Sequence, residues 1–131
     1  MPKSSIVLFV APRHAVEKHR SGIEATHGEW VIAHSTEEAL TMLGNEDIRI
    51  PDAIVVRVQG PHGWDGVQFI TRVRKLARSR RVPMVVISTR EDEHYRTRVM
   101  AAGAGAYLVE PVEFEEIVAA VRTAISKACV R

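Results

Sequence analysis

The sequence predicts one α/β domain, in which five parallel strands form a doubly wound (βα)5 sheet. Two observations lead to this fold class. Apolar segments rich in β-branched residues alternate with segments of helical periodicity five times along the 131 residues. The apolar segments are continuous, which is typical of strands buried on both faces. Strands joined through helices run parallel, because their connections must cross over.

Five segments are predicted to be strands. Ile6 to Ala11 is an uninterrupted apolar run, Ala53 to Val58 is interrupted only by Arg57, and Met84 to Ile87 is apolar throughout. Two shorter runs, Trp30 to Ala33 and Ala106 to Val109, complete the set. Each strand is followed by an interval long enough for a helix.

Helical patterns fill these intervals. The last is the clearest, because its apolar residues recur at i, i+3, i+4 and i+7 from Phe114 to Ile125. Ser35 to Glu38 resembles a capping box, and Gly44 is the expected end of the helix that follows. The remaining helices are expected over roughly 13–25, 66–76 with Asp65 as its cap, and 91–102.

Composition narrows the class of protein. The chain is 46% hydrophobic and 26% charged with a net charge of +2, as in soluble globular domains. Its single cysteine, Cys129, allows no internal disulfide and suits a reducing compartment. The first apolar run has only six residues before Pro12, too few for a secretory signal or a membrane span. We therefore expect a cytoplasmic protein.

Local motifs for catalysis and metal binding are missing from the sequence. The six histidines are scattered, and none has the spacing of a metal-binding pair. No Ser-His-Asp or Cys-His arrangement is suggested, and the glycine-rich segment 60–63 lacks the phosphate-binding pattern. We expect no enzyme activity, no metal and no cofactor.

In a sheet of this kind the ligand site lies outside the carboxyl ends of the strands. The residues just after each strand therefore decide what chemistry is available. They are Ala11-Pro12-Arg13, Arg57-Val58-Gln59, Ser88-Thr89-Arg90 and Glu110-Pro111.

Three stretches, in this order and spacing, resemble the response-regulator receiver (CheY-like) family. Pro51 to Val56 followed by Trp64-Asp65-Gly66 is similar to the family's third strand and the loop after it. Val82 to Ser88 is similar to the fourth strand, and Ala102 to Pro111 to the fifth strand and its proline turn. The resemblance covers nearly the whole chain, so residues 1–131 are expected to form a single domain.

The resemblance implies that the family's phosphorylation site is degenerate in this chain. A working receiver has a phosphate-accepting Asp after the third strand, an acidic pair for Mg²⁺ after the first, and a Lys after the fifth. The matching positions are Arg57, Ala11 with Pro12, and Glu110. Only the family's hydroxyl, at Ser88, and its switch aromatic, at Tyr107, are kept. A guanidinium has no nucleophilic oxygen, and Mg²⁺ needs oxygen ligands. The expected protein is a pseudo-receiver that is not phosphorylated on aspartate.

The Asp and Lys of a working receiver reappear here with their charges exchanged, as Arg57 and Glu110. We predict that these two side chains form a salt bridge across the carboxyl edge of the third and fifth strands. The planar fork of arginine suits a carboxylate, which can accept two hydrogen bonds from it.

The expected function is that of a phosphorylation-independent interaction module in bacterial signal transduction, an atypical stand-alone receiver. The resemblance implies docking, and possible homodimerisation, through the fourth helix, fifth strand and fifth helix. In this chain that face contains Glu91, His94, Tyr95, Arg98, Tyr107 and Val112. A kinase, another regulator, or a polarity or motility protein is the expected partner, and Trp64 is a candidate anchor for it.

Two other functions stay open. Arg13, Arg57 and Arg90 could converge on the former phosphate pocket and bind a small anion, although Glu110 opposes this. Nucleic acid could bind the basic stretch 72–81, but no aromatic residues interleave with its charges. That stretch contains Arg72, Arg74, Lys75, Arg78, Arg80 and Arg81. A solvated face at a helix C-terminus is the simpler interpretation of these residues.

Overall fold

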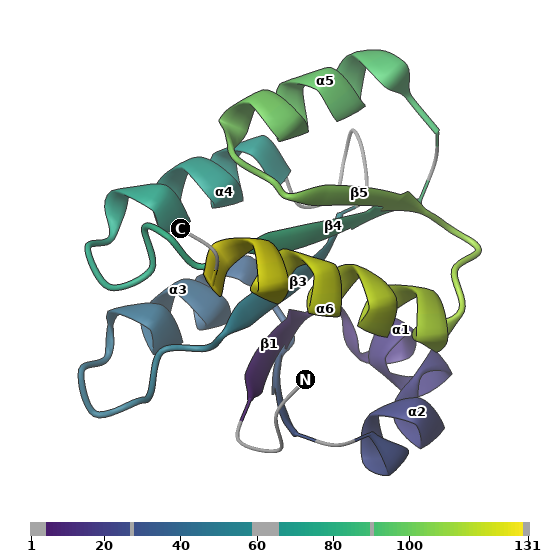
Figure 1. Ribbon diagram of the computed structural model, residues 1–131, viewed down its shortest axis with the longest axis horizontal. Coiled ribbons are helices and arrows are strands. Elements are labelled where there is room, and N and C mark those ends of the chain that lie inside the picture. The colour runs from purple at the N-terminus through teal and green to yellow at the C-terminus, as the bar shows by residue number, and fades with distance from the viewer. Residues whose placement is uncertain (1–4, 27, 59–65, 90, 130–131) are drawn as a thin grey trace.

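The computed structural model describes residues 5–26, 28–58, 66–89 and 91–129. They form one sheet of five parallel strands in the order β2-β1-β3-β4-β5, which confirms the predicted fold class (Figure 1). The strands are β1 Ile6–Val10, β2 Glu29–Ala33, β3 Ala53–Val58, β4 Met84–Ser88 and β5 Ala106–Val109. All five carboxyl ends therefore meet at one edge of the sheet.

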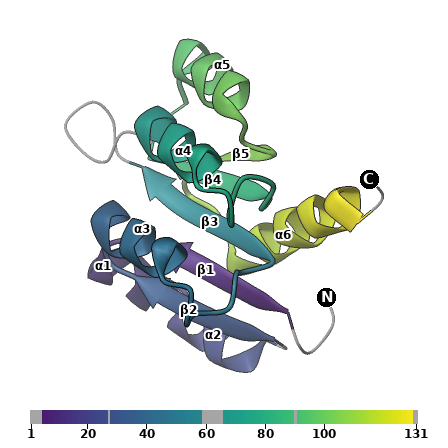
Figure 2. The same cartoon turned by 90° about the vertical axis from the view of Figure 1, so that its left-hand side faces the viewer.

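Helices cover both faces of the sheet. They are α1 Arg13–Lys18, α2 Arg20–Ala25, α3 Thr36–Gly44, α4 Gly66–Lys75, α5 Glu93–Ala102 and α6 Phe114–Cys129. Helices α3, α4 and α5 pack on one face, and α1, α2 and α6 on the other; Figure 2 shows α6 across the sheet from α3 and α4.

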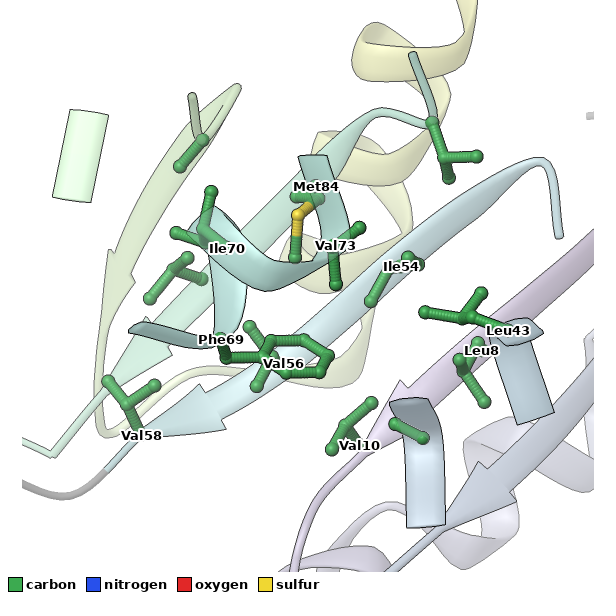
Figure 3. Packing of buried hydrophobic residues seen from close by; sticks show 14 of the residues in the cluster. Leu8, Val10, Leu43, Ile54, Val56, Val58, Phe69, Ile70, Val73 and Met84 are labelled. Atoms are coloured by element: carbon green, nitrogen blue, oxygen red, sulfur yellow. The ribbon is translucent and has the colours of Figure 1, made fainter. Parts of the chain in front are cut away.

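Each face of the sheet has its own apolar core. Alternate residues of β3 face opposite layers, so Ile54 and Val56 contact the α3–α5 core while Val55 contacts the α1–α6 core. Figure 3 shows the first core, in which Phe69 and Ile70 of α4 pack over β3 and β4. Burial of each such side chain contributes roughly 1.5–3 kcal/mol. Continuous apolar strands are thus explained by two buried faces.

The first helix differs from its predicted form. It is broken into α1 and α2 at His19, whose backbone has φ −111° and ψ 8°. The His19 ring packs against Phe9 and Phe114, with ring centroids 6.3 and 5.9 Å away. Gly22 permits this packing, because a Cβ there would lie 2.5 Å from Cδ2 of Phe114. The helix therefore bends where it meets the start of α6.

Helix ends follow the sequence signals only in part. The Ser35 hydroxyl accepts a hydrogen bond from the Glu38 N–H at 3.0 Å, as a capping residue should. Gly44, predicted as the stop signal, is instead the last helical residue of α3, and its φ is not positive. Asp92 caps α5 by accepting from the N–H of Tyr95 at 3.0 Å, so this helix begins at Glu93. The predicted cap Asp65 lies outside the described residues.

Candidate functional site

The carboxyl edge of the sheet brings together residues from four separate segments. Arg57 lies beside Ile87 of β4, and Val58 is in register with Ser88. The Glu110 N–H donates to the carbonyl of Ser88 at 2.9 Å, which fixes the β5–α6 turn against the end of β4. Ala11 follows β1 at the same edge and donates to the carbonyl of Ala33 at 3.0 Å. The predicted pocket residues therefore meet at one edge.

Arg57 and Glu110 form the predicted salt bridge. Arg57 Nε donates to Glu110 Oε2 at 2.9 Å, and Nη2 donates to Oε1 at 3.0 Å. The two parallel bonds leave the carboxylate fully engaged by one edge of the guanidinium. Only 7% of the Arg57 side chain and 17% of the Glu110 side chain are exposed. The charges at this edge are therefore a mostly buried, neutral pair.

The Arg57 guanidinium has a further hydrogen-bond donor, Nη1, that does not contact Glu110. Its Nη1 is buried and has no hydrogen-bond acceptor among the described residues. Proteins rarely leave a buried donor unpaired, so this atom marks a place where a water molecule or an anion would be stabilised. The predicted third arginine of an anion site, Arg90, lies outside the described residues, and Arg13 is exposed on α1.

The charges around the pair favour its ionised form. The hydrogen bond from Arg57 lowers the pKa of Glu110, burial opposes that change, and the charges of Arg57, Lys18 and His19 add to the lowering. Burial lowers the pKa of His19, and the nearby carboxylate of Glu110 opposes this effect. The environment therefore favours the ionised form of Glu110 and the uncharged form of His19.

Among the described residues, the two positions after β1 provide no carboxylate for a metal ion. Ala11 is buried and its carbonyl lies 3.2 Å from Nδ1 of His34, while Pro12 is the residue before α1. Over the described part of the chain, no three His, Cys, Asp or Glu side chains are grouped as metal ligands would be. Divalent cations that prefer several oxygen ligands would find no side-chain oxygen at these two positions.

The predicted docking face is built from α5, β5 and the turn before α6. Glu91, His94 and Arg98 are exposed on it, whereas Tyr95, Tyr107 and Val112 are half-buried. The rings of Tyr95 and Tyr107 meet edge to face, with centroids 6.4 Å apart. This face is therefore polar at its rim and partly aromatic at its centre.

Tyr95 has a structural contact that sequence reasoning missed. Its hydroxyl oxygen accepts a hydrogen bond from the N–H of Gly66 at 2.9 Å, which ties α5 to the start of α4. A Cβ on Gly66 would lie 2.8 Å from that oxygen and 2.9 Å from Cγ1 of Val58. The tyrosine therefore supports the fold, and its replacement would not test docking alone.

The basic stretch 72–81 is only partly the solvated face that was its simpler interpretation. Arg74 Nη1 donates to the carbonyls of Ser79, Arg80 and Val82 at 3.4, 3.0 and 2.7 Å, and Nη2 to that of Gly103 at 2.8 Å. Its burial lowers its pKa. A long side chain can reach carbonyls of several segments, and no local sequence motif predicts such contacts.

Two more of these cations have partners. Arg78 donates to the carbonyls of Leu43, Asn45 and Ile48 and so holds the end of α3. Arg72 makes an exposed ion pair with Glu37, with 3.1 Å between Nη1 and Oε1. Lys75, Arg80 and Arg81 remain exposed. Trp64, the candidate anchor, lies outside the described residues.

Comparison with known proteins identifies the family. The model of the response regulator receiver domain matches residues 14–122. The chain is 32% identical over 103 residues to the sensor histidine kinase CheAY of Helicobacter pylori, covering 79% of this chain and 12% of that protein. It is 30% identical over 122 residues to the regulator KdpE of Escherichia coli, covering 92% of this chain and 51% of that protein. The chain thus spans about half or less of these relatives.

Solved structures agree with the fold. A putative response regulator from Chloroflexus aurantiacus superposes with a TM-score of 0.79 at 26% identity, covering 94% of this chain and 98% of that one. The chemotaxis protein CheY4 of Vibrio cholerae superposes with a TM-score of 0.78 at 22% identity, covering 92% and 98%. No helix in the described ranges is long and apolar enough to cross a membrane. The chain belongs to the response regulator receiver domain family of two-component signalling.

Proposed function

We propose that this receiver domain works as a phosphorylation-independent protein–protein interaction module. The observation that carries the proposal is the buried pair of Arg57 and Glu110, joined by two hydrogen bonds at the carboxyl edge of β3 and β5. A guanidinium stays protonated and has no nucleophilic oxygen, so Arg57 cannot accept a phosphoryl group. Phosphotransfer needs an acceptor, and β3 contains no carboxylate in its sequence AIVVRV.

The residues after β1 support the same conclusion. Ala11 and Pro12 provide no side-chain oxygen, whereas Mg²⁺ at a phosphoryl-transfer site is usually held by one or two carboxylates. Without the metal and the acceptor the domain has no means of catalysing its own phosphorylation. We therefore propose a cytoplasmic, non-enzymatic protein that needs no cofactor and acts through binding.

The surface of α5, β5 and the start of α6 is the proposed docking face. Of the ten residues of α5 only Val99 is buried, so most of this helix is available to a partner. Met100 adds an apolar side chain that is 37% exposed. His94 and Arg98 are exposed on the same helix and would contribute to the polar rim of an interface. A signalling protein, such as a kinase or another regulator, or a second copy of the domain would bind here.

Two measurements test the proposal. The protein is incubated with acetyl phosphate and Mg²⁺, and its intact mass is measured; we expect no added phosphoryl group. Partner capture from native lysate then compares wild type with Arg98→Glu, using Arg72→Glu as the matched control on α4. Loss of one retained protein in the first variant alone supports the docking face. A phosphorylated aspartate or glutamate, or equal retention by both variants, contradicts the proposal.

One observation favours a second candidate function, the sensing of a small anion. Nη1 of Arg57 is buried, has no acceptor within the part of the chain that the structure describes, and could bind an anion. Thermal unfolding in the presence of phosphate tests it, since an anion at a hundred times its dissociation constant stabilises the fold by roughly 2.7 kcal/mol. The same rise in an Arg57→Met variant would exclude this site.

A further inference from the structure

The opposite edge of the sheet, at the amino ends of the strands, holds a feature that the docking face does not explain. An open cleft of about 570 Å³ lies there, and its walls include Asp52 before β3, Val82 and Pro83 before β4, and Ile125 of α6. Arg80 and Arg81 also line it. Pockets for small molecules usually have volumes of roughly 300–1,000 Å³, so the cleft is large enough for one.

Hydrogen bonds from Arg74 and Ser79 hold the turn that contains Arg80 and Arg81. Arg74 donates hydrogen bonds to the carbonyls of Arg80 and Val82 at 3.0 and 2.7 Å, on both sides of Arg81. The fully buried hydroxyl of Ser79 donates to the carbonyl of Val73 at 2.8 Å and fixes the start of the same turn. A ligand held by such a turn loses less free energy to the ordering of the protein.

The positive charges of this turn have no ion-pair partner among the described residues. Arg80 and Arg81 are exposed, and no ion pair is found for either within residues 5–26, 28–58, 66–89 and 91–129. The acidic residue on the cleft wall is already engaged, because Asp52 Oδ2 accepts from the N–H of Ile6 at 2.7 Å and lies 4.0 Å from Arg49 Nη2. Two guanidinium groups are therefore left to neutralise an incoming anion.

From these observations we infer that the amino-edge cleft binds a small phosphorylated molecule. Guanidinium forks match the oxygens of a phosphate monoester, whose double negative charge balances two arginines. Val82, Pro83 and Ile125 give an apolar wall against which a planar or aliphatic body can pack. A nucleic acid fits less well, since its binding rests on neutralising many backbone phosphates with Lys and Arg side chains. Among the described residues, only the basic side chains of Lys75, Arg80 and Arg81 in the stretch 72–81 make no hydrogen bond or ion pair.

Titration calorimetry with adenosine monophosphate and with inorganic phosphate tests the inference. Wild type is compared with Arg80→Gln/Arg81→Gln, and Arg72→Gln serves as a control because it removes one exposed arginine of the same stretch. We expect the double variant to weaken adenosine monophosphate binding by about tenfold or more, through the loss of charged hydrogen bonds. The control should bind like wild type, and phosphate alone should bind more weakly because it leaves the apolar wall uncovered.

Amide chemical-shift changes locate the site in the same titration. They should fall on Val82, Ile125 and Ala128 and spare the Arg57–Glu110 edge. The inference is overturned if neither probe binds wild type, if the double variant binds as tightly, or if the shifts gather at the other edge. It is also overturned if single-stranded DNA binds to Arg80 and Arg81 with a steep salt dependence, which would assign them to a polyanion. None of these variants changes α5 or β5, so failure of this inference would leave the proposed docking face untouched, and the reverse is also true.

Discussion

Removing one partner of the Arg57–Glu110 pair should destabilise the fold more than removing both. Glu110→Leu leaves a guanidinium that is 93% buried and cannot lose its proton, and we expect a loss of about 3–5 kcal/mol. Arg57→Met leaves a carboxylate that can protonate instead. From the ordinary glutamate pKa of 4.5, protonation at pH 7 costs at most about 3.4 kcal/mol, and less with 17% of the side chain exposed.

The double variant Arg57→Met/Glu110→Leu should be within about 1.5 kcal/mol of wild type, since apolar side chains of similar volume replace the pair. Urea unfolding followed by circular dichroism measures all four proteins. With m-values of about 1–3 kcal/mol per molar urea, Glu110→Leu should lower the midpoint by roughly 2 M. Additive losses in the double variant would refute the reasoning, because they would mean that the two charges do not interact.

The pH dependence of stability provides an independent measure of the same pair. The pKa of Glu110 is lowered in the folded state, so the pair stabilises the fold fully above the unfolded value of 4.5. This contribution is lost as the pH falls through the lowered pKa. The double variant should lack that component. A loss of stability in acid through His19 should persist in it, because burial is the main cause of the lowered folded pKa of His19. Identical acid unfolding curves would contradict the assignment.

The remaining predictions concern contacts that hold the helices. Arg74→Met should lower the free energy of unfolding by about 2–4 kcal/mol, because it leaves carbonyls of two segments without their charged donor. The control Arg72→Met, which removes an exposed ion pair, should lower it by less than about 1 kcal/mol; chemical denaturation measures both. Tyr95→Phe should cost about 1 kcal/mol through loss of the bond to Gly66, and an unchanged melting temperature would show that this bond contributes nothing. Gly22→Ala should destabilise the fold by about 1–3 kcal/mol, since the added methyl group would overlap the ring beside it; a stabilised variant would show that α2 can move away.

The sequence predicted the layout of the fold because the apolar segments are long and continuous. That layout also placed Arg57 and Glu110 at one edge, since both follow the carboxyl ends of parallel strands, and their opposite charges then suggested the bond. The break at His19 was not predictable, because it depends on the rings of Phe9 and Phe114 from distant segments. Helix periodicity alone favoured one continuous helix.

The roles of the arginines show a second limit of sequence reasoning. Arg74 and Arg78 look like neighbours of a solvated charge run, yet both bind carbonyls up to 35 positions away along the chain. Backbone acceptors exist at every residue, so the sequence contains no sign of which ones a long side chain will reach. Charge counts therefore overestimated how much of this stretch is available to a nucleic acid.

The orientation of the buried pair restricts which mutational paths are open to this domain. Arg57→Asp alone would place a second carboxylate opposite Glu110 in a site where so little of either side chain is exposed. Glu110→Lys alone would set an ammonium group against the guanidinium. Each single step creates repulsion between like charges of the kind that disfavours both ionised forms. Exchanging the charges requires two substitutions together, so selection on single steps would keep the present arrangement in place.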